Sequence, residues 1–310
     1  MKADEFDSII FDCDGVLIDV TESYDTTINK TISYVLKEIA DITVDTPLTN
    51  EILLKFKSTG GFNDEIDITY SGVLCFIAAK KLNKNPTKLI IDVLDNADDS
   101  GITYIENFLN KIDVDISDIK SRLDYPSADK NDLIHATFDQ LFFGPELYSR
   151  IFQKKSNFSE KGFIENDNVI VNSELIEALK KKFNDKIAIV TGRGFNAISS
   201  SLKEILNQFN VENSIFLEDE SRDLAKPNPQ SLIRAMKGLD SKTCLYVGDS
   251  MEDMILAQKA SELGFQATFC GIYGSSKLPD MKKKLFTERG VPFILETINQ
   301  LPDSLTIKKA

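Results

Sequence analysis

Cysteine and histidine are scarce in this chain, and their positions exclude several kinds of site. The four cysteines, Cys13, Cys75, Cys244 and Cys270, form no Cys-x-x-Cys pair, and the single histidine, His135, is near none of them. A zinc site built from clustered cysteines and histidines is therefore not expected. Because a disulfide pattern is also missing, a reducing compartment fits best, and we expect a cytoplasmic protein. His135 falls within a helical pattern and is expected to be structural.

Long apolar runs are absent too. No run approaches the roughly 20 residues that a membrane-spanning helix requires, and the first residues do not have the pattern of a signal peptide. Acidic residues are in excess, since 36 lysines and arginines stand against 49 aspartates and glutamates, a formal net charge of -13 at pH 7. Such a chain repels nucleic acids and anionic membrane surfaces, so we expect neither as a partner. It repels anionic substrates as well, so a site for one requires local cations or a metal ion.

The rest of the composition is that of an ordinary globular protein, with 42% hydrophobic and 27% charged residues among 310. Short apolar runs rich in β-branched residues, most of them flanked by turn residues, predict strands. Helical spacing in Ser173–Phe183 and Ala197–Phe209 separates some of these runs. The alternation predicts an α/β fold with a doubly wound, Rossmann-like parallel sheet as its core. The predicted strands are Phe6–Phe11, Lys186–Thr191, Ser214–Leu217, Thr243–Val247, Phe265–Ile272 and, more weakly, Val291–Leu295.

The region between residues 21 and 161 has a different pattern. Strand-like runs are nearly absent from it, and helical periodicity recurs, for example between Ile28 and Ile39 and between Leu133 and Phe142. We therefore predict an all-helical domain inserted after the first strand. The expected domains are a core formed by residues 1–20 and 162–310, and a helical insert formed by residues 21–161.

Two aspartates follow the first predicted strand. Asp12 and Asp14 are two residues apart and precede Gly15. They are expected at the carboxyl edge of the sheet, where ligands bind in open α/β folds. One carboxylate can attack phosphorus, and the other can move protons. Two adjacent carboxylates repel each other unless a cation joins them, and Mg²⁺ suits oxygen ligands beside a phosphate.

The sequence resembles the haloacid dehalogenase superfamily, on its phosphatase side, because four motifs match in the expected order. They are Asp12–Val16, Ile187–Arg193, Lys226–Pro229 and Val247–Asp253. Each motif adjoins a predicted strand or helix, and together they span the core. The resemblance implies a Mg²⁺-dependent phosphatase, similar to phosphoglycolate phosphatases, that hydrolyses a small phosphorylated metabolite through an aspartyl-phosphate intermediate.

The helical insert resembles a cap of this superfamily. Between Asp14 and Thr191 lie 191 − 14 − 1 = 176 residues, and between Thr191 and Lys226 lie only 226 − 191 − 1 = 34. The superfamily inserts its caps at one of these two points, so the insert is implied to be a cap that determines substrate choice. This arrangement resembles the phosphoglycolate phosphatase and phosphoglucomutase group, although the insert is longer than expected for that group.

The resemblance implies a metal site formed by aspartates. Asp12 is implied to be both the nucleophile and a metal ligand. Asp14 is implied to be the general acid and base, with a backbone carbonyl that also binds the metal. Asp249 is an implied metal ligand. Asp253 either binds the metal directly or supports the metal ligands without contacting the metal. Mg²⁺ is the implied cofactor.

A second group of motif residues is implied to hold the phosphoryl group. The Thr191 hydroxyl and the Gly192 amide would bind phosphoryl oxygens, and Lys226 would neutralise charge on Asp12 and on the group in transfer. Arg193 has two open roles. It can clamp a substrate carboxylate or second phosphate, or it can pair with a neighbouring acid.

Two further positions have alternative interpretations. In the insert, Gly61 and Asn63 belong to the segment Thr59–Asp64, where paired glycines allow close backbone approach and the asparagine offers hydrogen bonds to a substrate. The same segment can equally be a turn between helices. Asp19 can cap a helix or lie at the hinge of the cap.

The same core leaves other reactions open. A phosphomutase of the β-phosphoglucomutase type would return the phosphoryl group to the substrate, and a phosphonate hydrolase would need a cap lysine that forms a Schiff base. Dehalogenation is disfavoured, because its aspartate nucleophile normally lacks the second carboxylate present here as Asp14. A non-catalytic binding module is disfavoured, because every catalytic position is retained. The sequence leaves both a monomer and a homodimer open.

Overall fold

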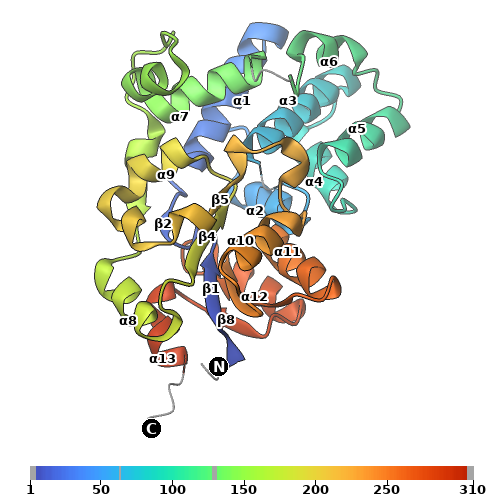
Figure 1. Ribbon diagram of the computed structural model, residues 1–310. Helices are drawn as coiled ribbons and strands as arrows, with labels where there is room; N and C mark the ends of the chain where they lie inside the picture. Colours follow the sequence, from blue (N-terminus) through green and yellow to red (C-terminus); the bar gives the residue numbers. More distant parts are fainter. Residues whose placement is uncertain (1–4, 63, 128–130, 306–310) are drawn as a thin grey trace. The chain divides into compact units, whose positions relative to one another are not determined.

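The computed structural model describes residues 5–62, 64–127 and 131–305, and the chain divides into two compact units (Figure 1). The core unit is formed by Met1–Thr21 with Asp167–Ala310, and the helical unit by Glu22–Asn166. The sequence predicted boundaries after residues 20 and 161. In the structure the units meet after residues 21 and 166, so the predicted boundaries are one residue and five residues too early. Within the described ranges, no helix is both long enough and apolar enough to cross a membrane.

The core unit is built on a six-stranded sheet whose paired strands all run parallel. β1 lies inside the sheet, where Ile10 pairs with Ala188 on one side and with Tyr246 on the other. All four residues of β1 are buried, which explains its unbroken apolar sequence. The strand order is β5 (Ile215–Phe216), β4 (Ile187–Thr191), β1 (Ser8–Phe11), β6 (Thr243–Gly248), β7 (Gln266–Ile272) and β8 (Phe293–Leu295). The doubly wound, Rossmann-like core predicted from the sequence is confirmed.

Helices cover the two faces of this sheet. In Figure 1, α8 and α13 lie on one side of the strands and α10 and α11 on the other. The amphipathic pattern of α8 buries Leu175, Ile176, Leu179 and Phe183, and Asn172 caps its first turn. The helices of the core are α8 (Ser173–Phe183), α9 (Phe195–Leu202), α10 (Gln230–Gly238), α11 (Met251–Glu262), α12 (Pro279–Glu288) and α13 (Leu301–Ser304).

The prediction of one continuous helix over Ala197–Phe209 was wrong. The α-helix α9 ends at Leu202, and a 3-10 helix follows over Lys203–Gln208. Lys203 has φ 50°, a left-handed conformation that interrupts the α-helical hydrogen-bond pattern. The apolar spacing continues across this break, and the 3-10 segment buries Leu206.

A two-stranded antiparallel ribbon adjoins both points at which the chain passes between the two units. It consists of β2 (Ile18–Asp19) and β3 (Asn168–Val169). Asp19 accepts hydrogen bonds from the backbone N and the Oγ1 of Thr21, at 3.1 and 2.8 Å. The first helix of the helical unit has Ser23 at its N-cap, so the interpretation of Asp19 as a helix cap is wrong.

The helical unit packs around α3, which is buried along most of its length. α1, α4, α5 and α7 all contact this helix. α7 is kinked at Gly144, which has φ 69° and is followed by Pro145. An ideal Cβ on Gly144 would lie 2.3 Å from the backbone N of Gly162. The helices are α1 (Tyr24–Ala40), α2 (Asn50–Ser58), α3 (Glu65–Leu82), α4 (Pro86–Leu94), α5 (Ile102–Lys111), α6 (Ser117–Leu123) and α7 (Leu133–Phe152).

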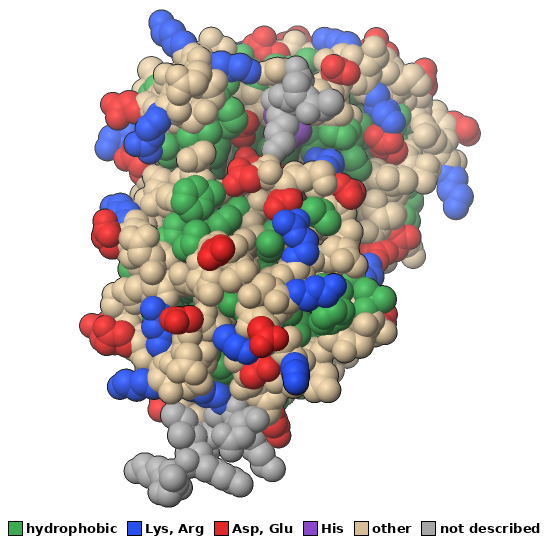
Figure 2. Space-filling view, in the orientation of Figure 1, with side chains coloured by type: hydrophobic (Ala, Val, Ile, Leu, Met, Phe, Trp, Pro, Cys, Tyr) green, Lys and Arg blue, Asp and Glu red, His purple; other side chains and the backbone are tan. Residues whose placement is uncertain are grey.

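Charged side chains are distributed over both units. Figure 2 shows acidic and basic side chains mixed over one face of the molecule. The large acidic excess of the sequence is therefore accompanied by local cations, which an anionic ligand would require.

Candidate active site

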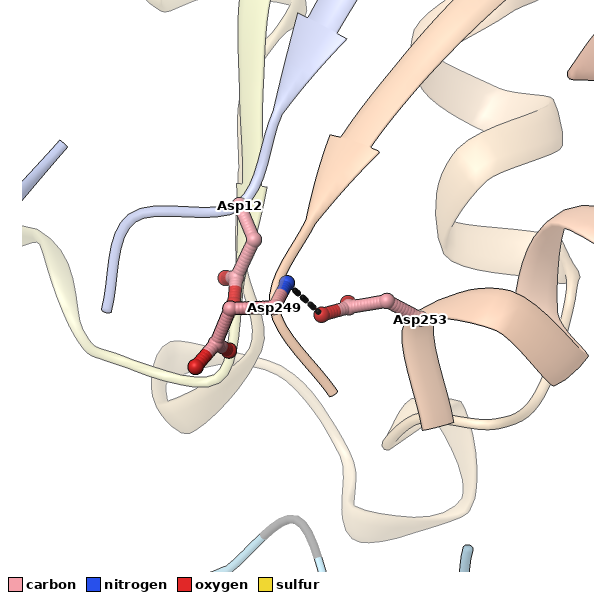
Figure 3. Close-up of side chains that lie close together, drawn as sticks. All are labelled: Asp12, Asp249 and Asp253. Atoms are coloured by element: carbon pink, nitrogen blue, oxygen red, sulfur yellow. Dashed lines mark hydrogen bonds between the residues drawn. The ribbon is translucent and has the colours of Figure 1, made fainter. Parts of the chain in front are cut away.

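Three aspartates meet at the carboxyl edge of the central sheet. Asp12 directly follows β1 and Asp249 directly follows β6, and these two strands are neighbours in the sheet. Asp253 comes from the first turn of α11. Each of the three offers a carboxylate oxygen, and these oxygens lie within 4.8 Å of one another. Figure 3 shows the side chains of Asp12 and Asp249 side by side, with Asp253 directed toward the backbone of Asp249.

Lys226 joins two of these aspartates. Its Nζ lies 2.9 Å from Oδ1 of Asp12 and 2.7 Å from Oδ1 of Asp253, and its side chain is fully buried. Burial alone would lower the pKa of Lys226, but the charges of Asp12 and Asp253 outweigh it and hold that pKa well above its usual range. Lys226 thus places its ammonium group beside Asp12, which directly follows β1.

Asp253 is held by hydrogen bonds to both of its carboxylate oxygens. Oδ1 accepts from Lys226 Nζ at 2.7 Å and from the Tyr246 hydroxyl at 2.8 Å. Oδ2 accepts from the backbone N of Asp249 and of Ser250, each at 3.1 Å, and from Ser250 Oγ at 2.8 Å. Burial opposes the charge of this group, yet Lys226 and the hydrogen bonds lower its pKa below the usual range. Both oxygens of Asp253 therefore already have protein donors.

Asp12 has a different electrostatic setting. Burial raises its pKa well above the usual range, the charges of three neighbouring aspartates act in the same direction, and Lys226 opposes them. Gly15, three residues later, has φ 72°, and an ideal Cβ at this position would lie 2.1 Å from Oδ2 of Asp249. Glycine is required here because a side chain would occupy the space between the loop after β1 and Asp249.

Arg193 anchors the second aspartate of the first motif. Its Nε lies 3.0 Å from Oδ1 of Asp14, and its NH1 lies 2.6 Å from Oδ2 of Asp167. Ser201 Oγ donates to the same oxygen of Asp167 at 2.8 Å. The guanidinium is fully buried. Of the two roles left open by the sequence, the geometry matches pairing with neighbouring acids.

Thr191 and Gly192 lie at the end of β4, the other neighbour of β1. Thr191 is buried, and its Oγ1 accepts a hydrogen bond from the backbone N of Arg193 at 3.3 Å. The next two amides, of Gly194 and Phe195, donate to the side chains of Glu218 and Asp219.

A lysine that the sequence did not single out also enters the site. Lys282, on α12, forms an ion pair with Oδ2 of Asp249 and is only 7% exposed. The available signal was its spacing, because Lys282 precedes the fully buried Phe286 by four residues and thus shares its helix face. Lys282 belongs to the run Lys282–Lys284, and runs of lysines are usually exposed to solvent, so its burial was not expected.

Comparison with known families agrees with this arrangement. Residues 159–261 match the model of the haloacid dehalogenase-like hydrolase family. The chain is therefore similar to haloacid dehalogenase-like hydrolases over about a third of its length. This match agrees with the resemblance recognised in the sequence, because three of the four motifs lie within the matched residues. No curated protein sequence matches the chain.

Solved structures resemble the chain over most or nearly all of its length. Phosphatase Tt82 from Thermococcus thioreducens is 21% identical with a TM-score of 0.57, over 87% of this chain and 94% of that one. A structural genomics target is 18% identical with a TM-score of 0.59, over 98% of both chains. A predicted phosphoglycolate phosphatase from Haemophilus somnus 129Pt is 15% identical with a TM-score of 0.50, over 97% and 99% of the two chains. At these identities the likeness shows a shared fold.

Two expected substrate-binding positions, Gly61 and Asn63, belong to the insert. Gly61 belongs to the helical unit, where an ideal Cβ would lie 2.6 Å from the backbone N of Gly101, so it permits two backbones to approach closely. Asn63 lies outside the described residues. His135 is buried in the same unit, with Nδ1 2.6 Å from Oδ2 of Asp132, as expected for a structural residue.

Proposed function

We propose that this hydrolase is a Mg²⁺-dependent phosphatase that hydrolyses a small phosphorylated metabolite through an aspartyl-phosphate on Asp12. The observation that carries the proposal is the position of Asp12, buried at the end of β1 between the ammonium group of Lys226 and the carboxylate of Asp249. A nucleophilic carboxylate with a cation beside it is what phosphoryl transfer to an aspartate requires. The phosphatases among the similar folds support the same reaction class.

The residues at the sheet edge fit a magnesium ion. Asp12 and Asp249 offer hard oxygen ligands, and the missing side chain of Gly15 leaves space against Oδ2 of Asp249. The backbone carbonyl of Asp14 would complete the set from the same loop. Asp253, whose oxygens are engaged by five donors, would support the site from behind. When bound, Mg²⁺ would favour the charged form of Asp12 and neutralise phosphoryl oxygens.

The side chains then have distinct tasks in the first half-reaction. A carboxylate oxygen of Asp12 attacks phosphorus, and the bond between phosphorus and the leaving oxygen breaks. Asp14 gives its proton to that leaving oxygen, and Arg193 holds Asp14 in position. Lys226 offsets the negative charge that gathers on the phosphoryl oxygens, which the Thr191 hydroxyl and the Gly192 amide would bind.

The second half-reaction releases the phosphoryl group to water. Asp14, now ionised, takes a proton from a water molecule, which attacks phosphorus and displaces the carboxylate of Asp12. The products are inorganic phosphate, the dephosphorylated metabolite and the restored enzyme. We propose that the helical unit determines which metabolite enters, because the residues of the core act only on the phosphoryl group. A cytoplasmic setting is part of the proposal, and the four buried cysteines are free thiols.

Phosphate release from a panel of phosphorylated metabolites tests this function. The wild-type protein with Mg²⁺ should release phosphate from a few members of the panel, and Asp12→Asn should release none. Folding of the variant is checked by circular dichroism. An isomeric product that keeps its phosphate would instead assign the chain to the phosphomutases. Borohydride trapping of a lysine with substrate would assign it to the phosphonate hydrolases.

A further inference from the structure

We propose that Lys282 is a built-in counter-ion of the metal site, which holds Asp249 while no divalent cation is bound and must be displaced when one binds. The inference rests on the proposed function, because it takes the acidic cluster to be a metal site. It adds a residue that none of the four motifs contains. Its consequence is that the affinity for Mg²⁺ includes the cost of breaking the pair between Lys282 and Asp249.

The position of the ion pair supports this role. Nζ of Lys282 pairs with Oδ2 of Asp249, and an ideal Cβ on Gly15 would lie 2.1 Å from the same oxygen. The ammonium group therefore binds the oxygen of Asp249 that faces the loop carrying Asp12. That loop supplies the other ligands of the proposed site, so the lysine and a metal ion would share one carboxylate oxygen.

The arrangement of α12 indicates that Lys282 is placed there specifically. Its two neighbours in the run face elsewhere, with Lys283 Nζ 5.2 Å from the centre of the Tyr273 ring and Lys284 Nζ 3.7 Å from Glu288. Both of these lysines are exposed, whereas Lys282 is buried. Burying an ammonium group is unfavourable unless it is paired, so the pair with Asp249 accounts for a lysine on the apolar face of this helix.

The pair is also the one that a hydrated ion can replace most easily. The side chains of Lys226 and Arg193 are fully buried, but that of Lys282 is 9% exposed and that of Asp249 is 22% exposed. An ammonium group at this edge can move into water on its long, flexible stem when a divalent cation takes its place. Lys226 and Arg193 have no comparable access to solvent and would stay with their aspartates.

Binding of magnesium chloride, measured by isothermal titration calorimetry, tests the proposal without any substrate. Lys282→Met removes the charge and keeps an unbranched side chain, and Lys283→Met is the matched control on the exposed side of the same helix. We expect Lys282→Met to bind Mg²⁺ about fivefold to tenfold more tightly than the wild type, because no ion pair has to be broken. Lys283→Met should bind it with an affinity within about twofold of the wild type.

Thermal unfolding of the same proteins gives a second readout. Without metal, Lys282→Met should unfold at a lower temperature than Lys283→Met, because Asp249 is left among other carboxylates. Saturating Mg²⁺ should raise its midpoint by more than that of the control. Equal Mg²⁺ affinity in all three proteins would overturn the role of Lys282 and leave the metal site standing. No Mg²⁺ binding by any of them would overturn the proposed metal site, and the role of Lys282 with it.

Discussion

The ammonium group of Lys226 lies 2.7 Å from Oδ1 of Asp253, and both side chains are fully buried. Asp253 also accepts hydrogen bonds from the backbone of Asp249 and Ser250 through its other oxygen. One carboxylate thus fixes the cation beside Asp12 and, at the same time, the loop that carries Asp249. We propose that Asp253 acts through these partners, which is a different task from binding the metal itself.

We expect Asp253→Asn to reduce turnover strongly while leaving Mg²⁺ binding largely in place. The amide removes the charge that holds Lys226, so kcat should fall by about 100-fold. Breaking a buried ion pair should also cost about 3 kcal/mol of unfolding free energy. Steady-state kinetics, calorimetric titration with Mg²⁺ and urea unfolding measure the three effects. Asp249→Asn is the comparison, because it should weaken Mg²⁺ binding much more. Equal weakening by both variants would make Asp253 a direct ligand.

Asp12→Asn should abolish phosphate release with the fold intact. An amide oxygen is a poor nucleophile, and the expected loss of kcat is at least about a thousandfold. Phosphate release is measured on the best substrate of the wild type, and circular dichroism checks the fold. Undiminished turnover in Asp12→Asn would exclude the aspartyl-phosphate mechanism. Asp19→Asn, in the short ribbon outside the cluster, is a suitable control that changes the same functional group.

Arg193→Lys should lower kcat and leave KM nearly unchanged. The lysine keeps the positive charge but cannot contact Asp14 and Asp167 together, since the guanidinium reaches them through different nitrogens. Misplacing the acid and base group should reduce kcat by about 10-fold to 100-fold. Kinetics on the best substrate separate the two parameters. A large rise in KM with unchanged kcat would instead assign Arg193 to substrate binding.

The edge of the sheet could be predicted from the sequence because its determinants are local. Buried parallel strands require continuous apolar runs, and those before Asp12 and Asp249 are such runs. Their carboxyl ends meet at one edge of the sheet, so the two aspartates could be expected together although they are far apart in sequence. The positions of Thr191 and Lys226 could be expected from the family resemblance.

Other features could not be predicted, because they depend on contacts distant in sequence. Nothing in the local pattern shows that Lys203 adopts a positive φ and ends α9. The strands β2 and β3 have two residues each, too few for a periodic signal. Arg193 was ambiguous and Lys282 was not singled out for a related reason, since each pairs with an aspartate from another part of the chain.

The acid stability of the helical unit provides a further test. Asp132 caps α7, and its carboxylate contacts the backbone N of Ile134 and of His135, the Nδ1 of His135 and the Oγ of Ser127. Burial opposes the charge, but these hydrogen bonds outweigh it and lower the pKa of Asp132 from 3.8 to about 2. Because the folded-state pKa is depressed, the stabilisation is fully present above the unfolded-state value and is lost as pH falls from about 4 to about 2.

Asp132→Asn removes this charge and keeps a side-chain oxygen that can cap the helix. At pH 7 the variant should be about 2 kcal/mol less stable than the wild type, and the difference should shrink as pH falls through the window from 4 to 2. Urea unfolding followed by circular dichroism at pH 7, 5, 3.5 and 2.5 measures this. Asp118→Asn, an exposed change in the first turn of α6, should leave stability nearly unchanged at every pH. A constant difference between Asp132→Asn and the wild type from pH 7 to pH 2.5 would show that the charge of Asp132 does not stabilise the folded helical unit.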